Sequence, residues 1–260
     1  MNRATVSDLR DLSPSMLPPR GSDGRTRVLF LTSTALGFST YERELRRFTA
    51  QRDDIDAVHV ALRPSPAMKL MGLRVPGLGK WDFQSHRYMR MWAWRISSWF
   101  RSSLDPRCFD VVHATTENNA LALPGVKRRT GLPFSVYIDT TTALFCREFG
   151  HNPATGAPNL AAERTIFGAA DLVACMSEWA RASVHADYGV PDSRTMLARS
   201  AIDLPRERAP EPGTRPGPVR LVFVGNDWVR KGGPRVVAWH QQHFADRAEL
   251  HLVGKGAPAM

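Results

Sequence analysis

The sequence predicts an α/β protein whose first domain is doubly wound. Over the first 200 residues, short apolar runs alternate with helical patterns, which is typical of a parallel sheet with helices on both faces. Residues 205–218 then contain five prolines, two glycines and five charged residues, the composition of a linker. A further strand-helix-strand pattern follows the linker. We therefore expect one complete domain and the first unit of a second.

Each element of the first domain follows from the spacing of its apolar residues. Short apolar runs predict strands, and apolar residues three or four positions apart predict helices. The strands are expected at 27–32, 57–62, 109–114, 134–138 and 171–176, and the helices at 41–48, 82–104, 118–129, 160–169 and 178–187. Such sheets bind ligands beyond the carboxyl ends of their strands, here after Thr32, His113, Ile138 and Met176.

The expected domain limits follow from these elements. Residues 1–26 mix Ser, Pro, Gly and charged residues without periodicity and predict a flexible leader. The first domain then occupies 27–204, the linker 205–218, and the partial second domain 219–260.

The composition is that of an ordinary globular protein, with 43% hydrophobic and 23% charged residues. Three scattered cysteines are too few for a disulfide framework or a cysteine-based zinc site, so we expect a reducing compartment and no bound metal. No apolar run reaches the roughly 18 residues of a spanning helix, and the N-terminus lacks the apolar core of a signal peptide. These observations predict a cytoplasmic protein, soluble or peripheral on the inner face of the membrane.

Positive charge is concentrated in residues 63–107. The chain has 35 Lys and Arg against 25 Asp and Glu, and this segment alone has nine basic and two acidic residues. Its cations, mixed with aromatic side chains, suit an anionic membrane, a phosphate-bearing lipid or nucleic acid. Nucleic acid is not expected as a partner, because no recognition motif is present. Apolar residues at helical spacing between Tyr88 and Phe100 equally fit a helix packed on a core, and both interpretations stay open.

The loop 225–233 meets the requirements of a phosphate site. It follows a strand expected at 219–224 and precedes a helix with Pro234 in its first turn, so backbone N–H groups and the helix dipole are expected to face a ligand. Arg230 and Lys231 add positive charge. The alternative is that the glycines only make the turn and that both cations are solvated.

Segments in the same order resemble the GT-B glycosyltransferases of family 4, also called group 1. They are residues 109–114 (FDVVHA), 170–179 (ADLVACMSEW), 188–191 (YGVP) leading to 201–203 (AID), and 223–233 (FVGNDWVRKGG). The last is similar to the Gly-x5-Lys-Gly segment that opens the C-terminal domain of the family. The likeness implies a GT-B-like fold, with a complete N-terminal Rossmann-like domain and the first strand-helix-strand unit of a second Rossmann-like domain.

The resemblance also implies an activity. Members of the family are glycosyltransferases, and we expect a hexosyltransferase-type enzyme that moves a sugar from a nucleotide sugar to a polysaccharide or lipid-linked acceptor with retention of configuration. A UDP- or GDP-sugar would be the substrate, and no cofactor is implied. The implied donor-binding residues are Gly225, Asn226, Arg230, Lys231 and Gly232. Lys231 would contact the diphosphate and stabilise the leaving nucleotide, whereas Asn226 stands where the family commonly has an arginine.

Four residues are expected on the acceptor side, and the resemblance implies two of them, Asp139 and Gly37. Asp139 stands where many relatives carry a histidine near the reacting sugar, so it is the candidate catalytic or acceptor-orienting group. Gly37 would lie in a glycine loop that meets donor and acceptor. His113, expected at the end of a strand, is either a substrate contact or a hydrogen-bonded structural residue. Ser177 lies at the same edge, and capping of the next helix explains it more simply than a nucleophilic role.

One feature of the family does not occur within the 260 residues. A pair of glutamates holds the donor sugar and the ribose in the family, and its place lies beyond Met260. We therefore expect the 260-residue chain alone to transfer sugar poorly or not at all. The alternative function is a non-catalytic, truncated remnant that binds an acceptor, a membrane or phosphate.

Overall fold

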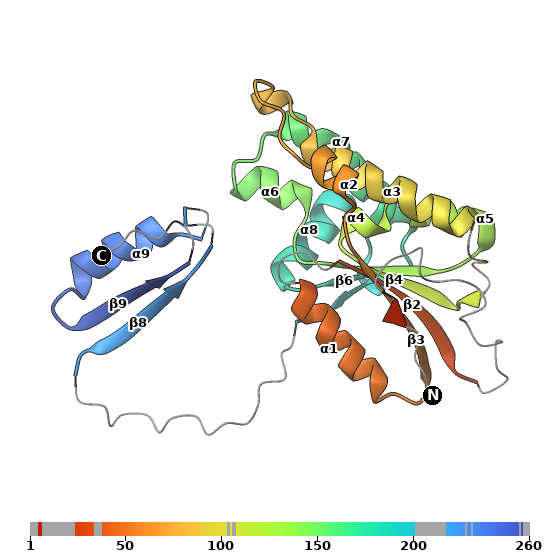
Figure 1. The fold of residues 1–260 in the computed structure, drawn as a ribbon, viewed down its shortest axis with the longest axis horizontal. Coiled ribbons are helices and arrows are strands. Elements are labelled where there is room, and N and C mark those ends of the chain that lie inside the picture. Colours follow the sequence, from red (N-terminus) through yellow and green to blue (C-terminus); the bar gives the residue numbers. More distant parts are fainter. Residues whose placement is uncertain are drawn as a thin grey trace. The chain divides into compact units, whose positions relative to one another are not determined.

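Figure 1 shows the computed structural model, in which the chain folds as two compact units, Met1–Asp203 and Leu204–Met260. The structure describes residues 5–6, 24–33, 38–102, 105, 108–200, 217–226, 228–229, 231–254 and 256. Most of the predicted leader and of the predicted linker lies outside these ranges.

Unit 1 is built on a seven-stranded sheet, counted within the described residues, in which every neighbouring pair is parallel. Its order is β1-β3-β2-β4-β5-β6-β7. The strands are β1 (Thr5–Val6), β2 (Thr26–Ser33), β3 (Ile55–Leu62), β4 (Val111–Thr115), β5 (Phe134–Ile138), β6 (Leu172–Cys175) and β7 (Thr195–Leu197). The doubly wound α/β fold predicted from the sequence is confirmed.

The two edges of the sheet differ from the prediction. Within the expected flexible leader, Thr5–Val6 pairs with β3, so the prediction is wrong at that point. This pairing occupies part of the backbone N–H and C=O groups that β3 would otherwise leave open at the edge. At the opposite edge, β7 pairs with β6 and was not expected, because a strand of three residues gives almost no periodic signal.

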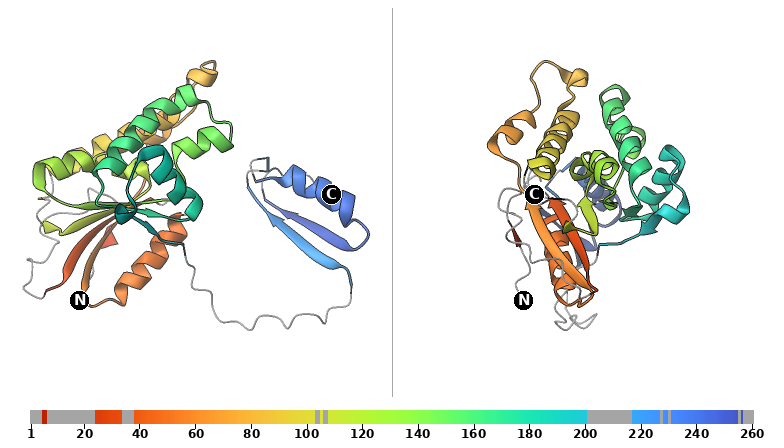
Figure 2. Two further views of the ribbon diagram at one scale, coloured as in Figure 1. Left: turned by 180° about the vertical axis from the view of Figure 1, so that it is seen from behind. Right: turned by 90° about the vertical axis from the view of Figure 1, so that its right-hand side faces the viewer.

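Helices cover the two faces of the sheet unequally (Figures 1 and 2). The described helices of unit 1 are α1 (Phe38–Ala50), α2 (Pro66–Met71), η3 (Gly79–Trp81), α3 (Gln84–Ser102), α4 (Glu117–Ala120), α5 (Leu123–Thr130), α6 (Thr142–Glu148), α7 (Pro153–Ala169), α8 (Glu178–Tyr188) and η5 (Asp192–Arg194). Side chains of a strand point alternately to the two faces. Leu29 of β2 belongs to the large core that includes Ile96 of α3, whereas Val28 belongs to a small cluster with Leu45 of α1. None of the helices in the described part of the chain combines the length and hydropathy needed to cross a bilayer.

The helix of the basic segment, α3, packs its apolar stripe on the sheet. Its buried residues are Met89, Trp92, Ile96, Trp99 and Phe100. Tyr88 and Met91 pack against the same core, whereas Trp94 is 66% exposed. The core interpretation of the stripe is confirmed. The membrane interpretation of the other cations and apolar side chains in residues 63–107 stays a prediction.

Other helices differ from the prediction at prolines and caps. The helix expected at 118–129 is two helices, α4 and α5, because Pro124 lacks the N–H group that a continuous helix would use and instead lies in the first turn of α5. Helix α7 begins earlier than expected, at Pro153, because the Asn152 side chain caps it. Helix α6 was not expected, and the Thr141 side chain caps it.

Unit 2 is a strand-helix-strand unit, as the sequence predicts. β8 (Val219–Val224) and β9 (Ala248–Val253) pair in parallel, and α9 (Gly233–His243) connects them. Pro234 lies in the first turn of α9. Burial alternates along both strands, so one face of the pair is partly covered and the other is exposed.

Mutations on the buried and on the exposed face of α3 are expected to lower the free energy of unfolding by different amounts. Ile96 is 0% exposed, so Ile96→Ala leaves a cavity against the sheet and is expected to lower the free energy of unfolding by about 2–5 kcal/mol. Trp94→Ala on the same helix removes an exposed side chain and is expected to change it by about 0.5 kcal/mol or less. Urea unfolding followed by far-UV circular dichroism measures both. Equal losses in the two variants would contradict this orientation of α3.

Candidate functional site

The carboxyl ends of β2 and β4 lie side by side at the point where the strand order reverses. From β2 the chain passes to β3 on one side and then returns to β4 on the other. The Ser33 N–H donates to Thr115 Oγ1 over 2.8 Å, and Thr115 Oγ1 donates to the Leu31 carbonyl over 3.4 Å. Doubly wound sheets bind ligands at such a reversal. This edge is therefore the candidate site of unit 1.

Thr116 turns the chain sharply out of β4. Its φ of 66° and ψ of 151° lie in a region that β-branched residues rarely adopt, and among the described residues no other residue except glycine has a positive φ. The Thr116 N–H donates to the Tyr137 carbonyl of β5 over 2.8 Å, which fixes the turn against the next strand. The turn makes Glu117 the first residue of α4. Backbone strain of this kind is concentrated at functional sites.

Two carboxyl groups with raised pKa lie at this edge. Burial raises the pKa of Glu117 to about 8, and the negative charges of Glu163 and Asp139 add to the shift. Asp139 directly follows β5. The residue is exposed as a whole, yet partial desolvation raises the pKa of its carboxyl group. Because Glu117 titrates near neutral pH, this edge can exchange a proton with a bound hydroxyl group.

Glu163 of α7 is a buried carboxylate that fixes the start of α6. It is 1% exposed and accepts hydrogen bonds from Thr142 N over 3.0 Å and from Thr142 Oγ1 over 2.6 Å. The Tyr188 hydroxyl donates to its second oxygen. Burial raises the pKa of Glu163. Between Asp139 and α6, the Thr140 hydroxyl is buried without a hydrogen-bond partner in the described structure.

Glu117 and Glu163 were not among the residues expected from the sequence. A glutamate in a helical pattern normally lies on the solvated face, so nothing in the spacing marks these two as desolvated. The position of Glu117, shortly after the strand expected at 109–114, was the available signal. Within the described ranges, no group of three His, Cys, Asp or Glu side chains is placed to hold a metal ion.

His113 lies inside β4, so the prediction that it ends the strand is wrong. The strand continues to Thr115 because Val112, His113 and Thr115 all pair with β5. The ring Nδ1 is 2.8 Å from Ser135 Oγ, and Nε2 is 3.3 Å from the Tyr41 hydroxyl. Burial lowers the pKa of His113 to about 4, so the ring is neutral near pH 7. Both ring nitrogens therefore have hydrogen-bonding partners within the fold, and a contact of His113 with substrate stays a prediction.

Two other residues of the expected acceptor side have different outcomes. Ser177 caps α8, as predicted, and its Oγ accepts a hydrogen bond from Ala180 N over 3.2 Å. Gly37 lies outside the described residues, and its expected contact with donor and acceptor stays a prediction.

In unit 2, the turns that follow β8 and β9 depend on glycines at close contacts. A Cβ atom at Gly254 would lie 2.0 Å from the carbonyl oxygen of Gly225, and one at Gly233 would lie 2.1 Å from the Trp228 ring. Gly232 has a φ of 83° and is the N-cap of α9. The expected role of the glycines in the turn is confirmed.

The same loop offers a ligand the charge of Lys231 and not the first two backbone positions of α9. The Gly233 N–H donates to the Trp228 carbonyl over 2.9 Å, and Pro234 has no N–H group. The expectation that backbone N–H groups face a ligand is therefore wrong for the first two residues of α9. Lys231 is exposed and forms no ion pair within the described residues, and Asn226 is exposed as well. Arg230 lies outside the described residues, so the charge of Lys231 is what remains for an anion.

The geometry of unit 1 agrees with a known family. The family model described as Glycosyltransferase Family 4 matches residues 37–206, which is more than half of the chain. The chain belongs to glycosyltransferase family 4. A search of curated protein sequences found no match.

Solved structures show the same fold as this family 4 chain. Sucrose-phosphate synthase from Thermosynechococcus elongatus is 14% identical with a TM-score of 0.58, and the comparison covers 88% of this chain and 62% of that chain. The lipopolysaccharide outer core galactosyltransferase WaaB in its apo form is 13% identical with a TM-score of 0.54, over 89% of this chain and 62% of that chain. A glycotransferase of kitacinnamycin is 11% identical with a TM-score of 0.54, over 91% and 68%. The GT-B-like fold predicted from the sequence is confirmed, and the chain spans 62% of the length of the first of these proteins.

The raised pKa of Glu117 predicts that the free energy of unfolding depends on pH. A carboxyl group whose pKa is higher in the folded chain binds more protons when folded, so the free energy of unfolding falls as pH rises from about 4.3 to about 8. His113, whose pKa is lowered to about 4, acts in the opposite sense but only below about pH 6.5. We therefore expect stability to fall between about pH 6.5 and 8, by at most about 1.4 kcal/mol per pH unit.

Glu117→Gln is expected to flatten this dependence, because glutamine does not titrate. Glu178→Gln, at an exposed position of α8, is the control and is expected to keep the slope of the original chain. Urea unfolding of the three proteins across this pH range gives the comparison. An unchanged slope in Glu117→Gln would remove Glu117 from this role.

Proposed function

We propose that the protein is a glycosyltransferase that moves a hexose-type sugar from a nucleotide sugar to a polysaccharide or lipid-linked acceptor, with retention of configuration. The observation that supports it best is the pair of carboxyl groups, Glu117 and Asp139, at the reversal point of a doubly wound sheet in a chain of family 4. Among the similar structures, one is a lipopolysaccharide outer core galactosyltransferase and another a sucrose-phosphate synthase, which agrees with sugar transfer. The proposed donor is a UDP- or GDP-sugar.

The carboxyl edge of unit 1 is the proposed acceptor site. In the transfer, the acceptor hydroxyl group would give its proton to the Asp139 carboxylate and bond to the sugar, while the bond between the sugar and the diphosphate breaks and the nucleoside diphosphate leaves. Asp139 would accept a hydrogen bond from this hydroxyl group and orient it. Glu117 is mostly protonated near pH 7, so it adds little negative charge beside Asp139. The strained turn at Thr116 and the bonds of Glu163 to α6 hold both groups in place before the acceptor binds.

The loop between β8 and α9 is the proposed donor site of unit 2. Lys231 is exposed there without an ion-pair partner among the described residues, and it would bind the diphosphate of the nucleotide sugar. Its positive charge would stabilise the nucleoside diphosphate as it leaves. Gly225 and Gly232 would shape the loop, and Asn226 and Arg230 would complete its contacts with the donor.

The proposal includes the place of the reaction. The described cysteines, Cys108, Cys146 and Cys175, are free thiols, which agrees with a reducing compartment such as the cytoplasm. We further propose that residues 63–107 bring the protein into peripheral contact with an anionic membrane, where a lipid-linked acceptor would be found.

Lys231→Ala tests the donor site. Loss of a charge-assisted contact with a diphosphate is expected to weaken binding of a UDP- or GDP-sugar about tenfold or more. Arg247→Ala, an equal loss of charge at the opposite end of α9, is expected to leave the affinity within about twofold. Isothermal titration of the three proteins gives the dissociation constants. Unchanged affinity in Lys231→Ala would exclude this residue as the diphosphate contact.

Asp139→Asn tests the acceptor site. The amide keeps the shape of the side chain but not its charge, so release of nucleoside diphosphate in the presence of acceptor is expected to fall about 100-fold. Donor affinity, measured by titration, is expected to stay unchanged. Asp53→Asn, exposed in the turn before β3 at the opposite edge of the sheet, is the control.

The same assay separates the two functions considered from the sequence. The unaltered protein is mixed with a nucleotide sugar and with pools of polysaccharide or lipid acceptors. If it binds the nucleotide sugar but releases no nucleoside diphosphate with any pool, the non-catalytic binding module is favoured. Equal rates in Asp139→Asn and Asp53→Asn would exclude Asp139 from the reaction.

A further inference from the structure

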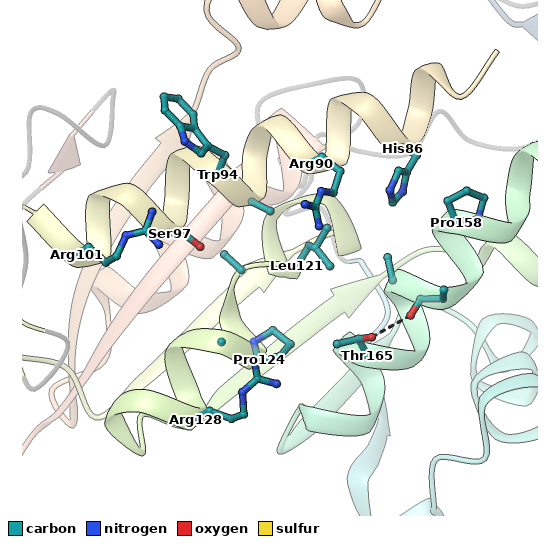
Figure 3. Close-up of a pocket in the computed structure, with 15 residues that line it drawn as sticks. His86, Arg90, Trp94, Ser97, Arg101, Leu121, Pro124, Arg128, Pro158 and Thr165 are labelled. Carbon is teal, nitrogen blue, oxygen red and sulfur yellow. Dashed lines mark hydrogen bonds between the residues drawn. The ribbon is translucent and has the colours of Figure 1, made fainter.

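A groove of about 640 Å³ lies between α3, α5 and α7, away from the residues proposed for transfer (Figure 3). Its volume is typical of a site for a small polar ligand. Apolar side chains from all three helices line it, among them Ala93, Leu121, Pro124 and Ala162. Three arginines and one tryptophan also line it.

The groove carries positive charge. Arg90 and Arg101 on α3 and Arg128 on α5 line it, and among the described residues no aspartate or glutamate does. Arg90 and Arg128 form no hydrogen bond or ion pair within the described structure, and Arg101 bonds only to Ser98 Oγ of its own helix, over 3.4 Å. Figure 3 shows these side chains along the groove. The groove therefore holds three positive charges without counter-charges.

Two other arginines of α3 form hydrogen bonds or ion pairs within the fold. Arg87 pairs with Asp82 over 2.7 Å, and Arg95 donates to the Arg63 carbonyl over 2.8 Å. Both help to hold the segment before α3 in place. The arginines of the groove have no comparable structural task, so their charge is free for a ligand.

Exposed apolar side chains lie on α3 and on the segment that packs against its N-terminal part. Trp94 lines its rim and is 66% exposed. The segment 70–81 packs beside α3, where Arg87 Nη2 donates to the Leu73 carbonyl over 3.0 Å. Its exposed apolar residues are Leu70, Met71, Leu73, Val75, Leu78 and Trp81. Aromatic and apolar side chains next to cations are typical of proteins that bind at the interface of an anionic membrane.

We propose that this groove binds the phosphate groups of anionic phospholipids, with Arg90, Arg101 and Arg128 as the headgroup contacts and Trp94 at the level of the interface. The proposal deepens the peripheral membrane contact within the proposed function by assigning it to a built site, and it adds Arg128, which lies outside the basic segment 63–107. Arg90 and Arg101 are about 16 Å apart along α3. That spacing suits a bilayer surface, which presents several phosphates at once, better than one free ion.

Vesicle binding tests the proposal without any need for transfer activity. The original chain is mixed with phosphatidylcholine vesicles that contain either no phosphatidylglycerol or a large fraction of it, at about 0.1 M salt. Sedimentation gives the bound fraction. The groove variant combines Arg90→Ala, Arg101→Ala and Arg128→Ala. The control variant combines Arg43→Ala, Arg47→Ala and Arg164→Ala, which are exposed residues outside the groove and remove the same charge.

We expect binding that requires phosphatidylglycerol and that falls at least tenfold in the groove variant but less than threefold in the control. Equal losses in the two variants overturn the proposal, because net charge alone would explain them. Loss of vesicle binding in millimolar inorganic phosphate or glycerol phosphate overturns the proposal, because a free phosphate would then be the ligand. Tighter binding to a single-stranded RNA than to the anionic vesicles overturns it as well. Failure of transfer activity alone leaves each of these results unchanged, so the two proposals are tested separately.

Discussion

The pairing of β2 with β4 is the constraint on which the candidate site of unit 1 depends. Parallel strands in this sheet are joined by crossovers, so Ser33 and Thr115, which are 82 positions apart in the sequence, meet only when β4 has returned past β3. The hydroxyl group of Thr115 then bridges both strands at their carboxyl ends. The turn at Thr116 starts from this fixed point, and it sets the direction in which Glu117 leaves the sheet.

Desolvation gives this edge its electrostatic character. The pKa values of Glu117, Asp139 and Glu163 are all raised, and burial is the largest cause for each. Glu163 is surrounded by hydroxyl and N–H donors, so it has a structural task in holding α6. Asp139 has solvent access, and Glu117 has a pKa near neutrality. Glu163 thus holds the start of α6, and the other two carboxyl groups are those that we propose for the acceptor site.

Elsewhere in the described structure, cations without ion-pair partners lie on the two surfaces that we propose to bind anions. Lys231 lies in a loop that ends at Gly233, where a Cβ atom would lie 2.1 Å from the Trp228 ring. Arg90 and Arg128 line a groove without carboxylates, whereas Arg87 and Arg95 of the same helix layer are bonded within the fold. Separating the bonded cations from the unbonded ones required the coordinates, because all of them look alike in the sequence.

The sequence by itself determined the order of the strands β2 to β6, the doubly wound first unit, the strand-helix-strand second unit and the cap at Ser177. Local patterns are sufficient for these features, since apolar spacing, prolines and capping residues act within a few positions. Tertiary structure decided the edge pairing of Thr5–Val6, the interior place of His113, the desolvation of Glu117 and the burial of Glu163. Each of these depends on contacts between distant segments, and the free energy of a charged side chain is set by the neighbours that remove its water.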